Sequence, residues 1–346
     1  MGRKKLVRKA EPPARRGIAW PRWTGFRGMT VRDWLQLLVV TLALVVISLL
    51  FAAQQDQRQQ NIEDQRAQQA QKIENQRAEA ERELAVQSAQ DEALQAYLDQ
   101  MSSLILEKDL RESKKHSEVR TLARARTLTV LRRLDSSRKG QVLSFLAEAN
   151  LVQGQGKNND QRVIKLGQAD LNDADLEAIT LTGADLHGAD LRGASLDLAT
   201  LSWAYLWGAE LNNADLSSTE LDHADLSHAD LTGANLRGTI ALRSLSLREA
   251  NLREADLSHA VMAGANLSGA DLRGADLGEA FLFKPDLSGA DLSGAHLSRA
   301  DLTGAKLKGT KGITSEELHQ QAETLEGATM PNGQKYEEWL KDQENK

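Results

Sequence analysis

Residues 184–196 read ADLHGADLRGASL, and residues 265–277 read ANLSGADLRGADL. In this part of the chain an apolar residue recurs every five positions, from Leu166 to Leu236 and again from Leu242 to Leu307. Of these 29 central residues, 28 are Leu and the other is Met262. Ala lies two positions before the central residue in 23 repeats, Asp or Asn lies directly before it in 16, and Gly lies two positions after it in 13.

A period of five matches neither the turn of an α-helix nor the two-residue alternation of a strand. Only a chain that turns a corner in every repeat keeps all central residues on one side. The pattern therefore predicts a solenoid with these residues along its axis. The six-residue step from Leu236 to Leu242 predicts one extra residue within 237–241, with Ile240 and Leu245 at inward Ala sites.

Across residues 163–310 this pattern resembles the pentapeptide-repeat family. The resemblance implies a right-handed quadrilateral β-helix with four repeats per coil. The central Leu and the Ala before it would point inward, and the other three positions outward. Residues 311–346 are predicted to form a helical cap over the last coil, with Thr314 or Ser315 as the N-cap of its first helix.

Near the N-terminus, residues 34–53 (WLQLLVVTLALVVISLLFAA) carry no charge. A helix of twenty residues spans about 30 Å, the thickness of a bilayer core. The basic tail at 1–33, predicted to be disordered, holds ten Lys and Arg, whereas the twenty residues after the segment hold three. The positive-inside rule therefore predicts a single-pass anchor with a cytoplasmic N-terminus and an extracytoplasmic repeat domain. A cleaved signal peptide is the rival interpretation, and the long region before the apolar segment disfavours it.

Between the anchor and the repeats the sequence is predicted to be helical. Residues 54–112 contain no Gly or Pro and favour one long spacer helix, in which Ile62, Ile73 and Leu84 recur every eleven residues. A solvated spacer and a coiled coil both fit this sparse stripe.

Residues 113–152 predict short helices, one of which has Leu122, Ala125, Leu128 and Leu131 on one face, and 153–162 predicts a flexible linker. Segments of this region, Ala93–Met101, Glu118–Asp135 and Arg138–Gly140, resemble a bacterial group of membrane-anchored pentapeptide-repeat proteins. That resemblance implies no activity.

Exposed aromatic residues are the best candidates for a partner site on a polar shaft. The candidates are Trp203, Tyr205, Trp207, Phe281 and Phe283. The alternative is that a cap or the helical connector covers them. His223 and His228 lie one repeat apart among Asp residues. We interpret them as outward polar residues, with a divalent-metal site as the alternative.

The sequence contains no Cys and no phosphate-loop, dinucleotide-binding or hydrolase motif, so we predict no catalysis, cofactor or metal. The leading hypothesis is a membrane-anchored scaffold that binds a protein partner through the faces of the shaft. A second copy, meeting the first through helix 54–112 or the end of the repeat domain, is a further candidate partner, whereas nucleic acid is disfavoured. The alternative hypothesis, suggested by the resemblance, is an acidic DNA mimic that regulates a DNA-binding enzyme. Residues 163–310 hold 22 Asp and Glu against 11 Lys and Arg, which suits a mimic, but the predicted export does not.

Overall fold

The computed structural model describes residues 30–154 and 162–345. Residues 1–29 of the predicted tail and 155–161 of the predicted linker therefore lie outside the described residues. The chain divides into two compact units, Met1–Leu84 and Ala85–Lys346.

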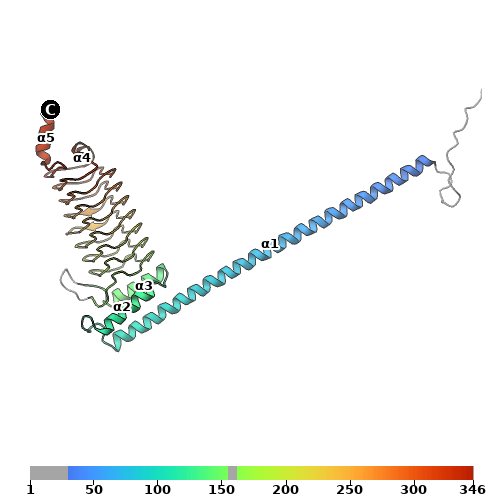
Figure 1. Ribbon diagram of the computed structural model, residues 1–346, viewed down its shortest axis with the longest axis horizontal. Helices are drawn as coiled ribbons and strands as arrows, with labels where there is room; N and C mark the ends of the chain where they lie inside the picture. Colours follow the sequence, from blue (N-terminus) through green and yellow to red (C-terminus); the bar gives the residue numbers. More distant parts are fainter. Residues whose placement is uncertain (1–29, 155–161, 346) are drawn as a thin grey trace, which may run out of the picture. The chain divides into compact units, whose positions relative to one another are not determined.

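Helix α1 (Val31–Leu106) is one uninterrupted helix of 76 residues (Figure 1). The structure thus corrects the predicted division into a membrane segment at 34–53 and a spacer at 54–112. The two are a single helix, and it ends six residues earlier than the predicted end. Neither Gly nor Pro occurs between residues 29 and 139, so the sequence holds no residue that would interrupt α1.

The N-terminal part of α1 includes a stretch that is long and apolar enough to cross a membrane, and none of that stretch is buried. From residue 54 to residue 84 the helix is exposed on every side. The predicted eleven-residue stripe is therefore open to solvent, with Ile62, Ile73 and Leu84 exposed by 48, 47 and 65%.

In the second unit, the end of α1 packs with two shorter helices, α2 (Glu118–Leu131) and α3 (Ser136–Glu148). The side chains of Ser117 and Asp135 cap α2 and α3 by accepting backbone N–H groups, which explains where both helices begin.

The predicted buried face of α2 was only partly right. Its buried residues are Ala123, Thr127, Val130 and Leu131, whereas Leu122 is 43% exposed. Residues three apart drift around a helix of about 3.6 residues per turn, so a strict interval of three cannot keep to one face. The buried face of α2 meets Tyr97 of α1, whose hydroxyl lies 2.9 Å from the Thr127 hydroxyl.

Helix α3 lies directly against the first coil of the repeats. The Asp175 N–H donates to the Ser136 carbonyl, and the Lys139 ammonium donates to the carboxylate of Asp170 at 2.8 Å and the carbonyl of Asn172 at 2.9 Å. Lys139 is only 4% exposed. One hydrophobic core therefore runs without a break from the helices into the repeats.

The repeats form a four-sided shaft, as predicted. Parallel bridges join residues that lie 20 positions apart, for example Asp170 to Asp190 and Asp190 to Glu210, so four repeats complete one coil. A typical corner is closed by the N–H of an Ala-site residue, such as Ala189, which donates to the carbonyl of the preceding central residue, Leu186, at 3.0 Å. The residue before the Ala site has a positive φ, as in Gly188, which is the pattern of a type II turn and explains the frequent Gly.

The Asp or Asn before the central residue also has a local role. Its side chain accepts the backbone N–H two residues later, as Asp215 does from Ser217 and Asp291 does from Ser293, each at 3.0 Å. Each of these bonds pairs the backbone N–H of the residue that follows the central residue. The hydroxyl and N–H of Ser293 hold the pKa of Asp291 below its usual value, because they stabilise the charged carboxylate.

The predicted position of the extra residue was wrong. Ala241, fully buried, takes the central site five residues after Leu236, whereas Leu242 is 57% exposed. Ile240 was expected to point inward. It instead lies in strand β1 (Ile240–Ala241), is 42% exposed, and pairs with Val261 of strand β2 (Val261–Met262).

The offset between paired residues changes from 20 to 21 between the Glu220–Ile240 and Asp225–Ser246 bridges. The extra residue therefore lies in the corner at 242–244, before the buried Leu245. Register here follows the hydrogen bonds between coils, and the larger side chain of Leu242 does not override it.

The C-terminal cap contains two helices, α4 (Ser315–Gln321) and α5 (Tyr336–Glu344). Of the two predicted N-caps, Thr314 is the N-cap of α4, and it forms a capping box with Glu317. Between the helices the chain returns to the shaft, because Thr324 bridges to Asp301 and Thr329 bridges to Lys306. The predicted cap is therefore only partly helical.

We expect Leu247→Ala to lower the free energy of unfolding by about 2–5 kcal/mol, because it empties a fully buried central site. Leu242→Ala, five residues earlier, is the matched control and should change it by less than about 0.5 kcal/mol. Urea denaturation of the detergent-solubilised full chain, followed by circular dichroism, measures both. A larger effect at Leu242 would contradict the register described above.

Gly140→Ala should destabilise the protein although Ala favours helix by about 1 kcal/mol. A Cβ at Gly140 would lie 2.1 Å from the carbonyl oxygen of Asp175, so α3 would have to move off the first coil. The exposed Ser144→Ala in the same helix is the control, and its melting temperature should stay the same or rise. An equal rise in both variants would show that α3 is not held against the shaft.

Candidate functional site

Three of the predicted aromatic residues lie on one side of a single coil. Trp203, Tyr205 and Trp207 point outward because they alternate with the inward Ala204 and Leu206. Trp203 lies in one corner turn and Trp207 lies in the next, with Tyr205 on the flat side between them. We call these three residues the aromatic face. Trp207 is 52% exposed, and the other two are half-buried.

Side chains from the next coil and from the start of the shaft support the aromatic face. The His223 ring stacks on Trp203 with centroids 3.8 Å apart, and the His228 ring meets the edge of Trp207 at 5.7 Å. The guanidinium of Arg162 lies 4.7 Å from the centre of the Tyr205 ring. These contacts hold the aromatic rings in place before any partner arrives.

A shallow hollow of about 220 Å³ opens beside the aromatic face. Trp203, Tyr205 and His223 line one part of it, and Asp225, Ser244 and Ser246 line the other. Ser244 belongs to the corner that holds the extra residue, so the irregular corner shapes this hollow. Its walls combine aromatic rings, an imidazole, hydroxyls and a carboxylate.

The other two predicted residues, Phe281 and Phe283, lie further along the shaft. Their rings are parallel, with centroids 6.3 Å apart, and are 42 and 36% exposed. Pro285 lacks the N–H that would close their corner, and Lys284 Nζ lies 4.8 Å from the Phe283 ring centre. The aromatic face and the two Phe residues are therefore two separate groups.

Sequence reasoning missed the residues that extend this second group. Ile240, Val261 and Phe281 pair in consecutive coils and so stand in one column. Two residues after each of them comes another apolar residue, on the same outward side of the extended backbone. We call the six residues the apolar strip: Ile240, Leu242, Val261, Ala263, Phe281 and Phe283.

The apolar strip ends abruptly at both sides. The same column holds Thr200 and Glu220 before it and Asp301 after it. Counting five residues on from Leu236 reaches Ala241, whereas counting five residues back from Leu247 reaches Leu242, so the sequence left both registers open. The prediction followed the larger apolar side chain.

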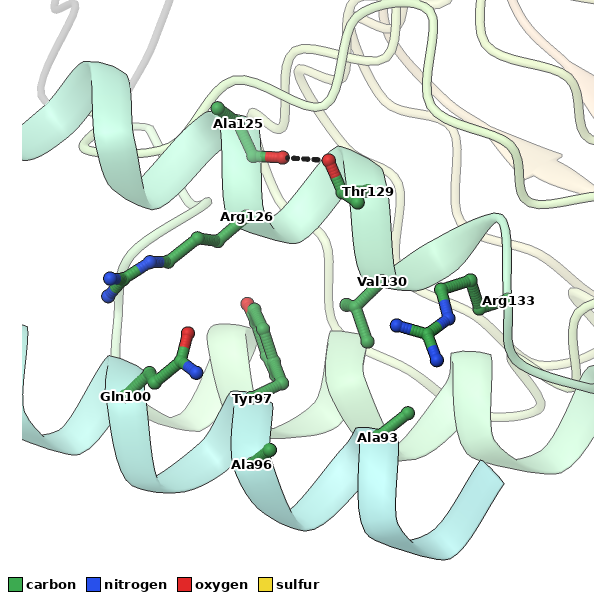
Figure 2. Close-up of a pocket in the computed structure, with 9 residues that line it drawn as sticks. All are labelled: Ala93, Ala96, Tyr97, Gln100, Ala125, Arg126, Thr129, Val130 and Arg133. Atoms are coloured by element: carbon green, nitrogen blue, oxygen red, sulfur yellow. Dashed lines mark hydrogen bonds between the residues drawn. The ribbon is translucent and has the colours of Figure 1, made fainter. Parts of the chain in front are cut away.

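A groove of about 300 Å³ lies between α1 and α2 (Figure 2). Its walls carry the small side chains of Ala93, Ala96 and Ala125. Arg126 extends from α2, and Arg133 extends from the turn after it. Tyr97 lies in it, and burial raises the pKa of its hydroxyl above the usual range, so the hydroxyl stays neutral. No nucleophile with an adjacent base lines this groove.

The two histidines considered as metal ligands are directed elsewhere. His223 stacks on Trp203, and His228 lies 3.5 Å from a carboxylate oxygen of Glu249. Within residues 30–154 and 162–345, no three His, Cys, Asp or Glu side chains are grouped so as to hold a metal ion.

Eight copies of a family model described as pentapeptide repeats match residues 164–197, 199–238, 242–282 and 286–311. HetL, a pentapeptide repeat protein involved in heterocyst differentiation regulation in the cyanobacterium Nostoc sp. strain PCC 7120, is 35% identical, over 50% of this chain and 81% of its own, with a TM-score of 0.24.

Two further solved structures are less similar in sequence. QnrB1, a plasmid-mediated fluoroquinolone resistance protein, is 20% identical, over 53% of this chain and 87% of its own, with a TM-score of 0.28. Rfr23, from the cyanobacterium Cyanothece 51142, is 29% identical, over 40% of this chain and 62% of its own, with a TM-score of 0.18. None of the curated proteins matches the chain.

Proposed function

The chain belongs to the pentapeptide-repeat family, whose members form right-handed quadrilateral β-helices, and we propose that it is a membrane-anchored scaffold that binds a protein partner. In this proposal the shaft is a rigid display surface, and it carries out no reaction. The partner meets the aromatic face and the apolar strip.

The apolar strip is the observation that carries this proposal. The outward columns elsewhere are rich in Asp, Asn, Ser and Thr, whereas three consecutive coils here direct Ile, Leu, Val, Ala and Phe outward. Ile240, Leu242, Phe281 and Phe283 are exposed, and Val261 and Ala263 are half-buried. An exposed apolar patch with a polar rim is typical of a protein interface. Hydrogen bonds between the coils hold the backbone of the strip, so little backbone entropy is lost on binding.

Anchoring rests on the exposed apolar stretch of α1 and on the charges that flank it. In this proposal residues 34–53 span the bilayer, with the ten basic residues of the tail on the cytoplasmic side. The repeats then lie on the opposite side of the membrane.

Crosslinking in native membranes tests the binding surface. We expect Phe281→Ala/Phe283→Ala to reduce the yield of the partner crosslink at least tenfold, because aromatic anchors dominate interface energies. Trp203→Ala/Trp207→Ala should reduce it as well. The control, Thr180→Ala/Thr200→Ala, alters polar residues in the column of the strip and should leave the yield unchanged. Full crosslinking by both aromatic variants would refute the proposed surface.

The acidic DNA mimic remains the second candidate, because residues 163–310 carry a net charge of −11. It differs from the scaffold in requiring a cytoplasmic shaft. The absence of Cys from the sequence gives a clean test of location. Asn332→Cys should react with a membrane-impermeant maleimide on intact spheroplasts, whereas Gly2→Cys should react only after lysis. The reverse pattern would overturn the proposed orientation and favour the mimic.

A further inference from the structure

A second surface lies where α2 meets the first coil, and Arg162 connects it to Tyr205 of the aromatic face. A hollow of about 160 Å³ there is lined by five Lys and Arg residues and a histidine. We call it the basic hollow, and its basic residues are Lys115, His116, Arg120, Arg124, Arg162 and Lys165. Its other lining residues are Thr121 and Val163, so within residues 30–154 and 162–345 no carboxylate lines it.

Three segments bring these charges together. Arg120 and Arg124 lie four residues apart and so share one face of α2. Lys115 belongs to the turn before α2, and Lys165 belongs to the first coil of the shaft. This concentration of positive charge stands out in a chain with a formal net charge of −6.

The two α2 guanidinium groups are fixed by neutral acceptors. Arg124 donates to the carbonyls of Lys165 at 3.1 Å and Gly167 at 2.9 Å. Arg120 donates to the Ser113 hydroxyl at 3.0 Å and to the Arg162 carbonyl at 3.4 Å. These bonds hold the groups in place without neutralising their charge, so an anion would meet a site that is already ordered.

The other cations are also positioned. Arg162 lies over the Tyr205 ring, and Lys165 Nζ lies 3.7 Å from an Asp185 carboxylate oxygen. Asp185 is shared, because its other oxygen lies 2.5 Å from Nδ1 of His187. One carboxylate therefore offsets part of the positive charge around the basic hollow.

We propose that the basic hollow binds a phosphate group. Guanidinium forks beside an ammonium match the charge and the oxygen geometry of phosphate. Sites for drug-sized ligands measure about 300–1,000 Å³, so the smaller basic hollow suits one anionic group. The acidic shaft beside it would repel an extended polyanion, which favours a single phosphate, either free or in a lipid headgroup, over nucleic acid.

Titration calorimetry of the full chain in zwitterionic detergent, with sodium phosphate at constant ionic strength, tests this. We expect saturable binding that weakens about tenfold in Arg120→Gln. Arg126→Gln is the matched control, because it removes the same charge from α2 but lines the groove toward α1 instead (Figure 2). Its affinity should equal that of the wild type. No binding by the wild type, or equal losses in both variants, would overturn the proposal.

A second variant distinguishes lost binding from lost folding, because Arg120 also donates a hydrogen bond to the backbone carbonyl of Arg162. Lys115→Gln alters an exposed residue and should weaken phosphate binding several-fold with an unchanged melting temperature. Unchanged binding in Lys115→Gln, together with an unfolded Arg120→Gln, would count against the site.

Nanodiscs of phosphatidylcholine with and without phosphatidic acid separate the two sources of phosphate. If the lipid headgroup is the ligand, phosphatidic acid should compete with free phosphate in the wild type, and Lys115→Gln should lessen that competition. If soluble phosphate is the ligand, its affinity should be the same in both kinds of disc. Each result supports the site and assigns the source.

Discussion

Closure of the corners by a backbone hydrogen bond, present in most repeats, is the constraint on which the structure depends. The bond from an Ala-site N–H to the preceding Leu carbonyl, with a positive φ between them, turns the chain once in five residues. It directs two residues of each repeat inward and leaves three outside. Burial of a Leu side chain is worth about 1.5–3 kcal/mol, so the stacked central residues supply much of the driving force for folding.

Because four repeats complete a coil, residues 20 positions apart stand in one column. A column can therefore be acidic, polar or apolar without disturbing the core. The Asp and Asn side chains bond to their own corners, so the acidic surface of the shaft is partly a structural requirement. A run of apolar residues in one column has no such local role, and this is why the apolar strip indicates binding.

The corner at 242–244, which holds the extra residue, links the two groups of outward aromatic residues. It exposes Leu242 at the start of the apolar strip and places Ser244 in the hollow beside Trp203. Where the shaft begins, α2 contributes the positive charges of Arg120 and Arg124, whereas the shaft itself carries a net negative charge. The ends of the core are themselves covered by helices, which prevents open strand edges from pairing with other chains.

The resemblance to the pentapeptide-repeat family supplied the four sides of the shaft and the inward Ala. The amino-acid sequence alone determined the repeat period, the inward central residues, an N-cap at Thr314 or Ser315, and the membrane-length apolar segment. Each depends on turn chemistry, capping or composition within a few residues. It also identified the five aromatic candidates, whose role as a partner site stays a prediction.

Only the tertiary structure decided that Ala241 and not Leu242 enters the core, that α2 buries Ala123 and Thr127, and that Arg124 lies against the first coil. These outcomes depend on bonds between distant residues, such as the 41-residue separation between Arg124 and Lys165. A local pattern cannot express such contacts, because the free energy that selects them comes from packing between segments.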